Sequence, residues 1–271
     1  MLARTQLRLR TNRRETLLPA GSTSHLNEIA RNKTKRSEGK PLWICEWVDV
    51  LFVHCECEAC ELQRTVPFGL DLFHGRAYVS LVSFMMRRFR PAFGGRLAEV
   101  LFLPFSTTLF LNVRTYVLHE GEPGIFFIAE FISNRFVVPF GPPLYGLPYR
   151  FARLTNVVGA NGGLMTRKIE MGGHRLRIEA HMREGKPAQK CEEGSLTKWL
   201  LERYTAFTVH RGKRRCFHIR HQPWLQCNVD SKVSDEGLLA PFSACFGSNS
   251  FVKANYSVGA EDVRMGMAKG L

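Results

Sequence analysis

The sequence lacks a run of about 18 to 20 uninterrupted apolar residues, which a membrane-spanning helix requires. The nearest candidate spans residues 97–113 and is interrupted by Glu99, Pro104 and Asn112. The basic start of the chain is not followed by an apolar stretch, so it does not predict a secretory signal. We therefore expect a soluble, cytoplasmic protein with no membrane-bound segment.

Glycine-rich nucleotide-binding motifs are absent as well, so we expect no cofactor. Eight cysteines are present. Without an export signal they should be free thiols. The segment from His54 to Cys60 offers ligands that zinc prefers, but no second ligand pair follows it. We therefore expect no metal site, and a zinc site on Cys55, Cys57 and Cys60 remains the alternative.

The positive charge is concentrated at the start of the chain. Residues 1–40 hold ten Lys or Arg and three Glu, which is +7 of the total net charge of +14. This segment has no apolar periodicity, so we expect a disordered basic tail. Contact with nucleic acid is expected only weakly, through this tail, and in a salt-dependent way.

Short apolar runs separated by glycine and proline begin at residue 41 and favour a mostly β domain over residues 41–258. Residues 109–118 and 125–132 predict a strong hairpin, and Ser195 is placed to cap a helix over residues 195–204. Strands are also expected at 47–54, 77–86, 149–157, 164–170, 175–182, 206–210, 216–220 and 250–257. The architecture implied is a large curled antiparallel sheet or barrel that holds a cavity, with few short helices. Residues 259–271 are expected to form a flexible tail.

Strand alternation places Asn112, Arg114 and Tyr116 on one face of the first hairpin strand, beside Phe110. A guanidinium turned into a barrel interior needs a partner, because a buried unpaired charge costs about 3 to 5 kcal/mol. Glu130 on the next strand would make a structural ion pair. An anionic ligand is the other possible partner, and the sequence leaves both open.

Seven segments occur in an order that resembles the YqjF-like family of uncharacterised bacterial proteins. They are WVDVLFVH at 47–54, GRAYVSLVSF at 75–84, LNVRTYV at 111–117, the GxPG turn at 121–124, YGLPYR at 145–150, LLERY at 200–204 and HxPW at 221–224. That family is similar in turn to acetoacetate decarboxylase, so the resemblance implies a cone-like barrel around a buried pocket.

The resemblance also bears on mechanism. Acetoacetate decarboxylases carry a lysine after a Gly-x-Pro segment, and this lysine forms a Schiff base with the substrate. The similar segment here ends in Tyr149 and Arg150, and lysine is absent from residues 41–167. Decarboxylation through a Schiff base is therefore not expected. Tyr149 could act instead as a general acid or hydrogen-bond donor, with Arg150 lowering its pKa.

These residues together predict a pocket that binds a small organic acid or carbonyl compound, with lyase- or hydrolase-type turnover left open. Arg114 would pair the anion, Asn112 and Tyr116 would orient it, and Glu130 and His221 complete the candidate set. His221 could instead be an ordinary packed histidine. The alternative function is a non-catalytic interaction protein whose tail contacts nucleic acid or an acidic partner. The sequence does not set the oligomeric state.

Overall fold

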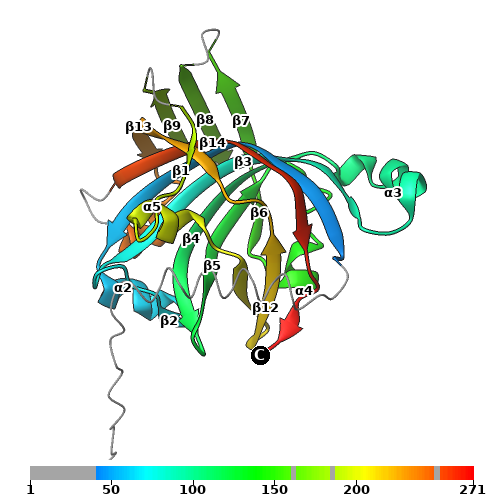
Figure 1. Cartoon of the computed structure of the whole chain (residues 1–271), viewed down its shortest axis with the longest axis horizontal. Helices are drawn as coiled ribbons and strands as arrows, with labels where there is room; N and C mark the ends of the chain where they lie inside the picture. Colours follow the sequence, from blue (N-terminus) through cyan, green and yellow to red (C-terminus); the bar gives the residue numbers. More distant parts are fainter. Residues whose placement is uncertain (1–40, 160–162, 184–186, 247–250) are drawn as a thin grey trace, which may run out of the picture.

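Strands dominate residues 41–159, 163–183, 187–246 and 251–271, which the computed structural model describes (Figure 1). The long strands are β1 (Trp43–Cys57), β3 (Ala77–Pro91), β4 (Thr108–His119), β5 (Glu122–Ile132), β8 (Leu164–Met171), β9 (His174–Met182), β12 (Lys213–Arg220), β13 (Leu225–Glu236) and β14 (Phe251–Met265). The shorter ones are β2 (Gly69–Leu70), β6 (Tyr149–Phe151), β7 (Arg153–Val158), β10 (Gln189–Lys190), β11 (Thr205–His210) and β15 (Lys269–Gly270). The helices are α2 (Ala59–Thr65), α3 (Gly95–Leu101), α4 (Gly141–Tyr145), α5 (Leu196–Leu201) and the 3-10 turns η1 (Leu103–Phe105) and η2 (Ala240–Cys245).

Seven strands form a closed ring. The hydrogen-bonded order includes β12-β11-β5-β4-β3-β1-β14, and β12 also pairs with β14 through Ile219↔Met265 and Arg220↔Arg264. All these pairings are antiparallel except β5 with β11. The strands therefore enclose an interior, in agreement with the predicted cone-like barrel of a mostly β protein.

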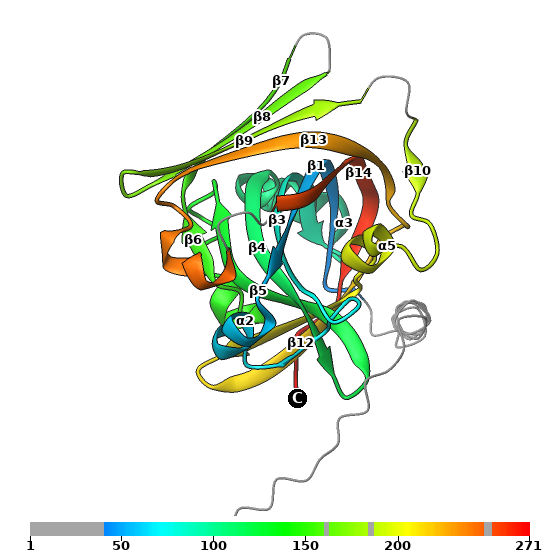
Figure 2. The same cartoon turned by 90° about the vertical axis from the view of Figure 1, so that its left-hand side faces the viewer.

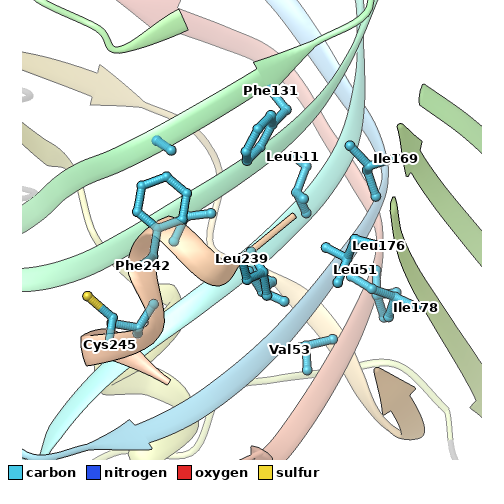
Figure 3. Packing of buried hydrophobic residues seen from close by; sticks show 14 of the residues in the cluster. Leu51, Val53, Leu111, Phe131, Ile169, Leu176, Ile178, Leu239, Phe242 and Cys245 are labelled. Carbon is cyan, nitrogen blue, oxygen red and sulfur yellow. The ribbon is translucent and has the colours of Figure 1, made fainter. Parts of the chain in front are cut away.

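Side-chain alternation along the ring strands separates two hydrophobic clusters. Leu51 and Val53 of β1 belong to one cluster, and Val50 and Phe52 belong to the other. The first cluster lies outside the ring, where Leu51 and Val53 meet Ile178 (Figure 3). The second lies inside the ring and is joined by Trp199, Leu200 and Leu201 of α5.

The outer cluster is covered by a second part of the sheet. Beyond β14 the order continues β13-β9-β8-β7, and these strands curve over the ring (Figure 2). β9 pairs with β13 along eight residues, Arg175–Met182. The two hydrophobic clusters thus occupy the two sides of the ring wall, and only the inner one can line an internal pocket.

Several predicted elements are confirmed. The hairpin of β4 and β5 turns at Glu120 and Gly121, both with positive φ, as a two-residue hairpin turn requires. Ser195 is the N-cap of α5, and its side chain accepts a hydrogen bond from the Lys198 amide. β11 and β12 form a hairpin around Gly212 from the strands expected at 206–210 and 216–220.

The expected flexible tail over residues 259–271 is wrong. β14 runs to Met265, and β15 pairs with β12 through Arg215↔Gly270. This end of the chain is polar and glycine-rich, but its backbone bonds come from distant strands. Gly259 shows how close that packing is, because a Cβ there would lie 1.9 Å from the Trp47 carbonyl oxygen.

Several further segments are not covered by the sequence-based expectations. β13 and α3 were not predicted. β13 is polar for most of its length, whereas α3 is short and its apolar residues Leu97, Val100 and Leu101 are exposed. The strand expected at 77–86 forms as the longer β3, and the short strand β2 before it pairs with β4. The proline-rich stretch after Val137 holds the five-residue α4, which uses prolines in its first turn.

The basic tail over residues 1–40 lies outside the described residues. Within the described part of the chain, none of the helices is both long and apolar enough to span a membrane.

Candidate ligand-binding site

A cavity of about 70 Å³ lies inside the ring of strands. Its apolar walls come from β1, β3, β4, β5, β12 and β14, with Leu147 and Trp224 from the connecting segments. Four polar side chains join this lining: Asn112, Arg114, Glu130 and Tyr149. These four were predicted as site residues, and strand pairing brings them together.

Arg114 is a partly buried cation without a close carboxylate among the described residues, and its Nε atom is shielded from solvent. Its Nη2 lies 3.4 Å from the Leu200 carbonyl oxygen at the end of α5, a long hydrogen bond. The guanidinium also lies 5.7 Å from the centre of the Phe52 ring. Nε has no hydrogen-bond partner among the described residues. Burial lowers the pKa of Arg114, while interaction with Tyr116 and the charge of Glu130 oppose this shift.

Glu130 lies directly opposite Asn112 in the β4–β5 pairing and opposite Tyr149 in the parallel β5–β6 pairing. It is buried, and its Oε2 has no hydrogen-bond partner in the part of the chain described. The Asn112 Oδ1 atom is also unpartnered there. Burial raises the pKa of Glu130 well above its usual range, and Arg114 offsets only part of that rise.

The structural ion pair that the sequence left open does not form between Arg114 and Glu130. Among the described residues, no carboxylate oxygen lies within 4.0 Å of the Arg114 guanidinium. A buried charge without a partner is costly, and a buried carboxyl without one tends to take up a proton. The cavity therefore holds an unneutralised cation beside a carboxyl group that favours its neutral form.

Tyr149 enters the cavity from β6, where its ring contacts Phe110 with centroids 6.0 Å apart. The ring also lies against Gly141, the first residue of α4, where a Cβ would come within 2.2 Å of it. Burial and the charge of Glu130 raise the pKa of Tyr149 well above its usual range. The Tyr149 hydroxyl is thus a neutral hydrogen-bond donor, not a readily ionised acid.

The pairing predicted for Tyr149 and Arg150 is wrong. Arg150 is exposed, and its guanidinium lies 5.3 Å from the centre of the Phe242 ring, which belongs to the outer cluster. Successive side chains of a strand point to opposite faces, so Arg150 lies outside the ring when Tyr149 lies inside it. Arg150 therefore does not lower the pKa of Tyr149 and does not reach the cavity.

Tyr116 shares the inner face with Arg114 but does not line the cavity. Its hydroxyl oxygen lies 2.6 Å from Ser80 Oγ, which in turn lies 2.7 Å from His54 Nδ1. All three side chains are buried, and burial lowers the pKa of His54 to about 3. These hydrogen bonds fix the Tyr116 hydroxyl among buried side chains, and interaction with Tyr116 opposes the lowering of the Arg114 pKa.

His221 is a packed histidine behind the cavity wall. Its ring lies 4.8 Å from that of Trp224 and 4.9 Å from that of Tyr204, and Nδ1 is 2.7 Å from the Gln222 carbonyl oxygen. It is not among the residues that line the cavity. Of the two interpretations open for His221, the structure agrees with the packed one.

Other lining residues were not predicted. Trp47, Phe52 and Phe127 could have been found from strand alternation, although a bulge between Val48 and Leu51 disturbs the register of β1. Met265 had no such signal, because it lies in the segment that was expected to be a tail. It reaches the cavity only because β14 closes the ring.

The cysteine-rich segment does not assemble a metal centre within the described residues. All eight cysteines are free thiols. Nowhere in the described ranges do three His, Cys, Asp or Glu side chains gather closely enough to hold an ion. Burial raises the pKa of Cys45 to about 12, which makes this thiol a poor nucleophile and metal ligand.

Comparison with known proteins gives one matching family and one curated relative. The sequence model of the DUF2071 family, described as an uncharacterized conserved protein, matches residues 45–253. The uncharacterized protein YqjF of Bacillus subtilis is 29% identical over 197 residues, which cover 71% of this chain and 79% of that protein.

Solved structures share the fold at low sequence identity. An acetoacetate decarboxylase from Legionella pneumophila superposes with a TM-score of 0.63 at 12% identity, over 86% of this chain and 88% of that one. The enduracididine biosynthesis enzyme MppR complexed with pyruvate gives a TM-score of 0.61 at 15% identity, over 86% and 91%. The acetoacetate decarboxylase-like fold is thereby confirmed.

Proposed function

The chain belongs to the DUF2071 family of uncharacterized conserved proteins, and we propose that it binds a small organic acid or carbonyl compound in the cavity inside its ring of strands. In this proposal Arg114 pairs with the carboxylate of the ligand. Asn112, Glu130 and Tyr149 hydrogen-bond to the rest of its polar part. The uncharged walls of the ring enclose the remainder.

The observation that carries this proposal is the state of Arg114. A partly buried guanidinium whose Nε is shielded from solvent, with no carboxylate of the described residues within 4.0 Å, is an unfavourable arrangement in the empty protein. A carboxylate ligand would supply the missing charge through the two-pronged hydrogen bonding that guanidinium groups favour. An unpaired Arg114 lowers the stability of the empty protein, and in this proposal it is retained because it binds the anion.

The cavity is the right size for a small polar group. At about 70 Å³ it holds on the order of five water-sized positions. A carboxylate with an adjoining carbonyl fits such a space. Tyr149 and the protonated carboxyl of Glu130 are both donors, so they suit the carbonyl oxygen of a 2-oxo or 3-oxo acid.

Turnover, if it occurs, would proceed without an imine to the protein. No lysine is present among the described residues that line the cavity. The donors Glu130 and Tyr149 could polarise a carbonyl group and stabilise the negative charge that develops on its oxygen. That arrangement is compatible with lyase- or hydrolase-type chemistry on the bound acid.

A thermal unfolding screen of the full chain tests the proposal. Pyruvate, acetoacetate, lactate and phenylpyruvate are the first probes, and pyruvate is favoured because one structural neighbour is complexed with it. We expect at least one acid to raise the Tm, because ligand at about 100 times its Kd adds about 2.7 kcal/mol to the free energy of unfolding. Nuclear magnetic resonance of the same mixtures would report any conversion of the acid.

The neutral amide of each active acid is the matched control, and it should leave the Tm unchanged. A chain without residues 1–40 should respond to the acids as the full chain does, because the proposal places the ligand among residues 47–265. If no acid raises the Tm, or if amides and acids act alike, the anion-binding proposal fails.

A further inference from the structure

A second, larger cavity adjoins the first. It has a volume of about 210 Å³, and none of the described residues that line it is charged. Aromatic rings form much of its wall, among them Trp43 at the start of β1, Phe89 near the end of β3 and Phe105 of η1. Leu144 of α4, which is 46% exposed, lines the cavity as well.

The two cavities share a wall. Met86, Tyr149 and Met265 line both of them. Methionine side chains are flexible and adapt to the shape of their neighbours. Tyr149 therefore stands between a small polar chamber that contains Arg114 and a wide apolar chamber. We call these the inner chamber and the outer chamber.

We propose that the outer chamber holds the apolar part of the same ligand, so that the ligand is an acid or carbonyl compound with a hydrophobic chain or ring. This inference rests on the proposed function, because it takes the carboxylate to lie at Arg114. An apolar cavity of about 150 Å³ is large enough for benzene, so the outer chamber has room for a group of that size. The inner chamber has room only for the polar end.

The chemistry of the two linings determines which part of the ligand each chamber would bind. The inner chamber is lined by the polar side chains of Arg114, Asn112 and Glu130, and these can fix one orientation of a carboxylate. The outer chamber offers mainly apolar contact, although Tyr145 and Tyr149 are part of its wall, and apolar contact strengthens binding in proportion to the area removed from water. A compound that spans the Tyr149 wall would use both kinds of interaction at once.

Calorimetric titration of the full chain with a homologous series tests the inference. The probes are pyruvate, 2-oxobutanoate, 2-oxohexanoate, 2-oxooctanoate and phenylpyruvate. Once the chain passes the wall, each added methylene should strengthen binding about fourfold until the outer chamber is filled. Phenylpyruvate should bind more tightly than pyruvate for the same reason.

Two tryptophan variants make the test specific to the outer chamber. Leu144→Trp would fill part of it and should weaken 2-oxooctanoate binding roughly tenfold, with little effect on pyruvate. Leu103→Trp is the control, because Leu103 is 63% exposed on η1 and does not line either chamber. It should leave the affinity for both acids unchanged.

The outcomes separate this inference from the proposed function. If pyruvate binds and depends on Arg114, but affinity does not rise with chain length or Leu144→Trp affects neither acid, the outer chamber is not a ligand subsite and only the inference fails. If no acid of any length binds, the proposed function fails and the inference falls with it.

Discussion

Replacing Arg114 by methionine should abolish acid binding while leaving the protein at least as stable as the native chain. Methionine keeps the aliphatic bulk of the arginine side chain but removes its charge. We expect affinity for an acid found in the screen to fall by about a hundredfold or more, because the buried partner of the carboxylate is lost. We expect the free energy of unfolding to stay within about 1 kcal/mol of the native value or to rise, because an unpaired buried cation has been removed.

Arg203→Met is the matched control for the stability measurement. Arg203 is also buried on the inner side, but its Nη1 lies 2.6 Å from the Asp71 carboxylate and its guanidinium lies 4.3 Å from the centre of the Trp199 ring. Breaking this pair leaves Asp71 buried without its cation, so a loss of about 3 to 5 kcal/mol is expected. Denaturant unfolding of both variants gives the comparison. A loss of similar size in Arg114→Met would show that Arg114 is structural.

Glu130→Gln should stabilise the protein at pH 8, by about 1 to 3 kcal/mol. The pKa of Glu130 is raised in the folded protein, chiefly by burial. The folded protein therefore binds a proton at the Glu130 carboxyl more tightly than the unfolded chain does. This contribution to stability is fully present below the pKa of Glu130 in the unfolded chain, and it is lost as the pH rises through the pKa in the folded protein. Glutamine has no proton to lose, so the advantage of the variant should grow as the pH increases above about 4.5.

Glu202→Gln is the control for this second substitution. Glu202 is also buried, but its Oε1 accepts a hydrogen bond 2.9 Å long from the Trp224 amide, and Oε2 accepts one from the Tyr204 hydroxyl. Loss of these charge-assisted bonds should destabilise the protein by about 1 to 3 kcal/mol. Urea unfolding between pH 5 and pH 8 distinguishes the two. If Glu130→Gln is as destabilising as Glu202→Gln at pH 8, then Glu130 has a structural partner.

Both predictions describe residues whose replacement is expected to cost little stability or to increase it. Polar groups that a ligand must meet are left without partners in the empty protein, so the site lowers stability in exchange for recognition. Arg203 and Glu202 lie in the same interior but have their partners already. Comparing the variants of Arg114 and Glu130 with those of Arg203 and Glu202 therefore distinguishes residues that bind a ligand from residues that stabilise the fold.

Local alternation was enough to predict much of the site. The spacing of Asn112 and Arg114 along β4 placed both on one face. The short turn after His119 alone would have put Ala129 opposite Asn112. A bulge between Val113 and Arg114, which the sequence did not predict, shifts the pairing by one residue so that Glu130 faces Asn112. Tyr149 was found through its resemblance to a lysine position, but the same alternation should have excluded Arg150. The error came from treating neighbours in sequence as neighbours in space.

The parts that sequence did not predict depend on distant partners. β13 is polar for most of its length and becomes a strand through its pairing with β9. Met265 reaches both chambers only because β14 meets β12 and closes the ring. The outer chamber is assembled from β1, β3, η1, α4 and β14, which share no local motif. The apolar periodicity of one segment does not show which distant segments it will pair with or pack against.

A crystal structure of the full chain with a bound 2-oxo acid, chosen as the tightest binder in the titration, tests the central claim most directly. We predict a carboxylate oxygen about 2.7 to 2.9 Å from the Arg114 guanidinium, with the carbonyl group facing Glu130 and Tyr149. An acid bound outside the ring, or inside it with its carboxylate turned away from Arg114, would contradict the account.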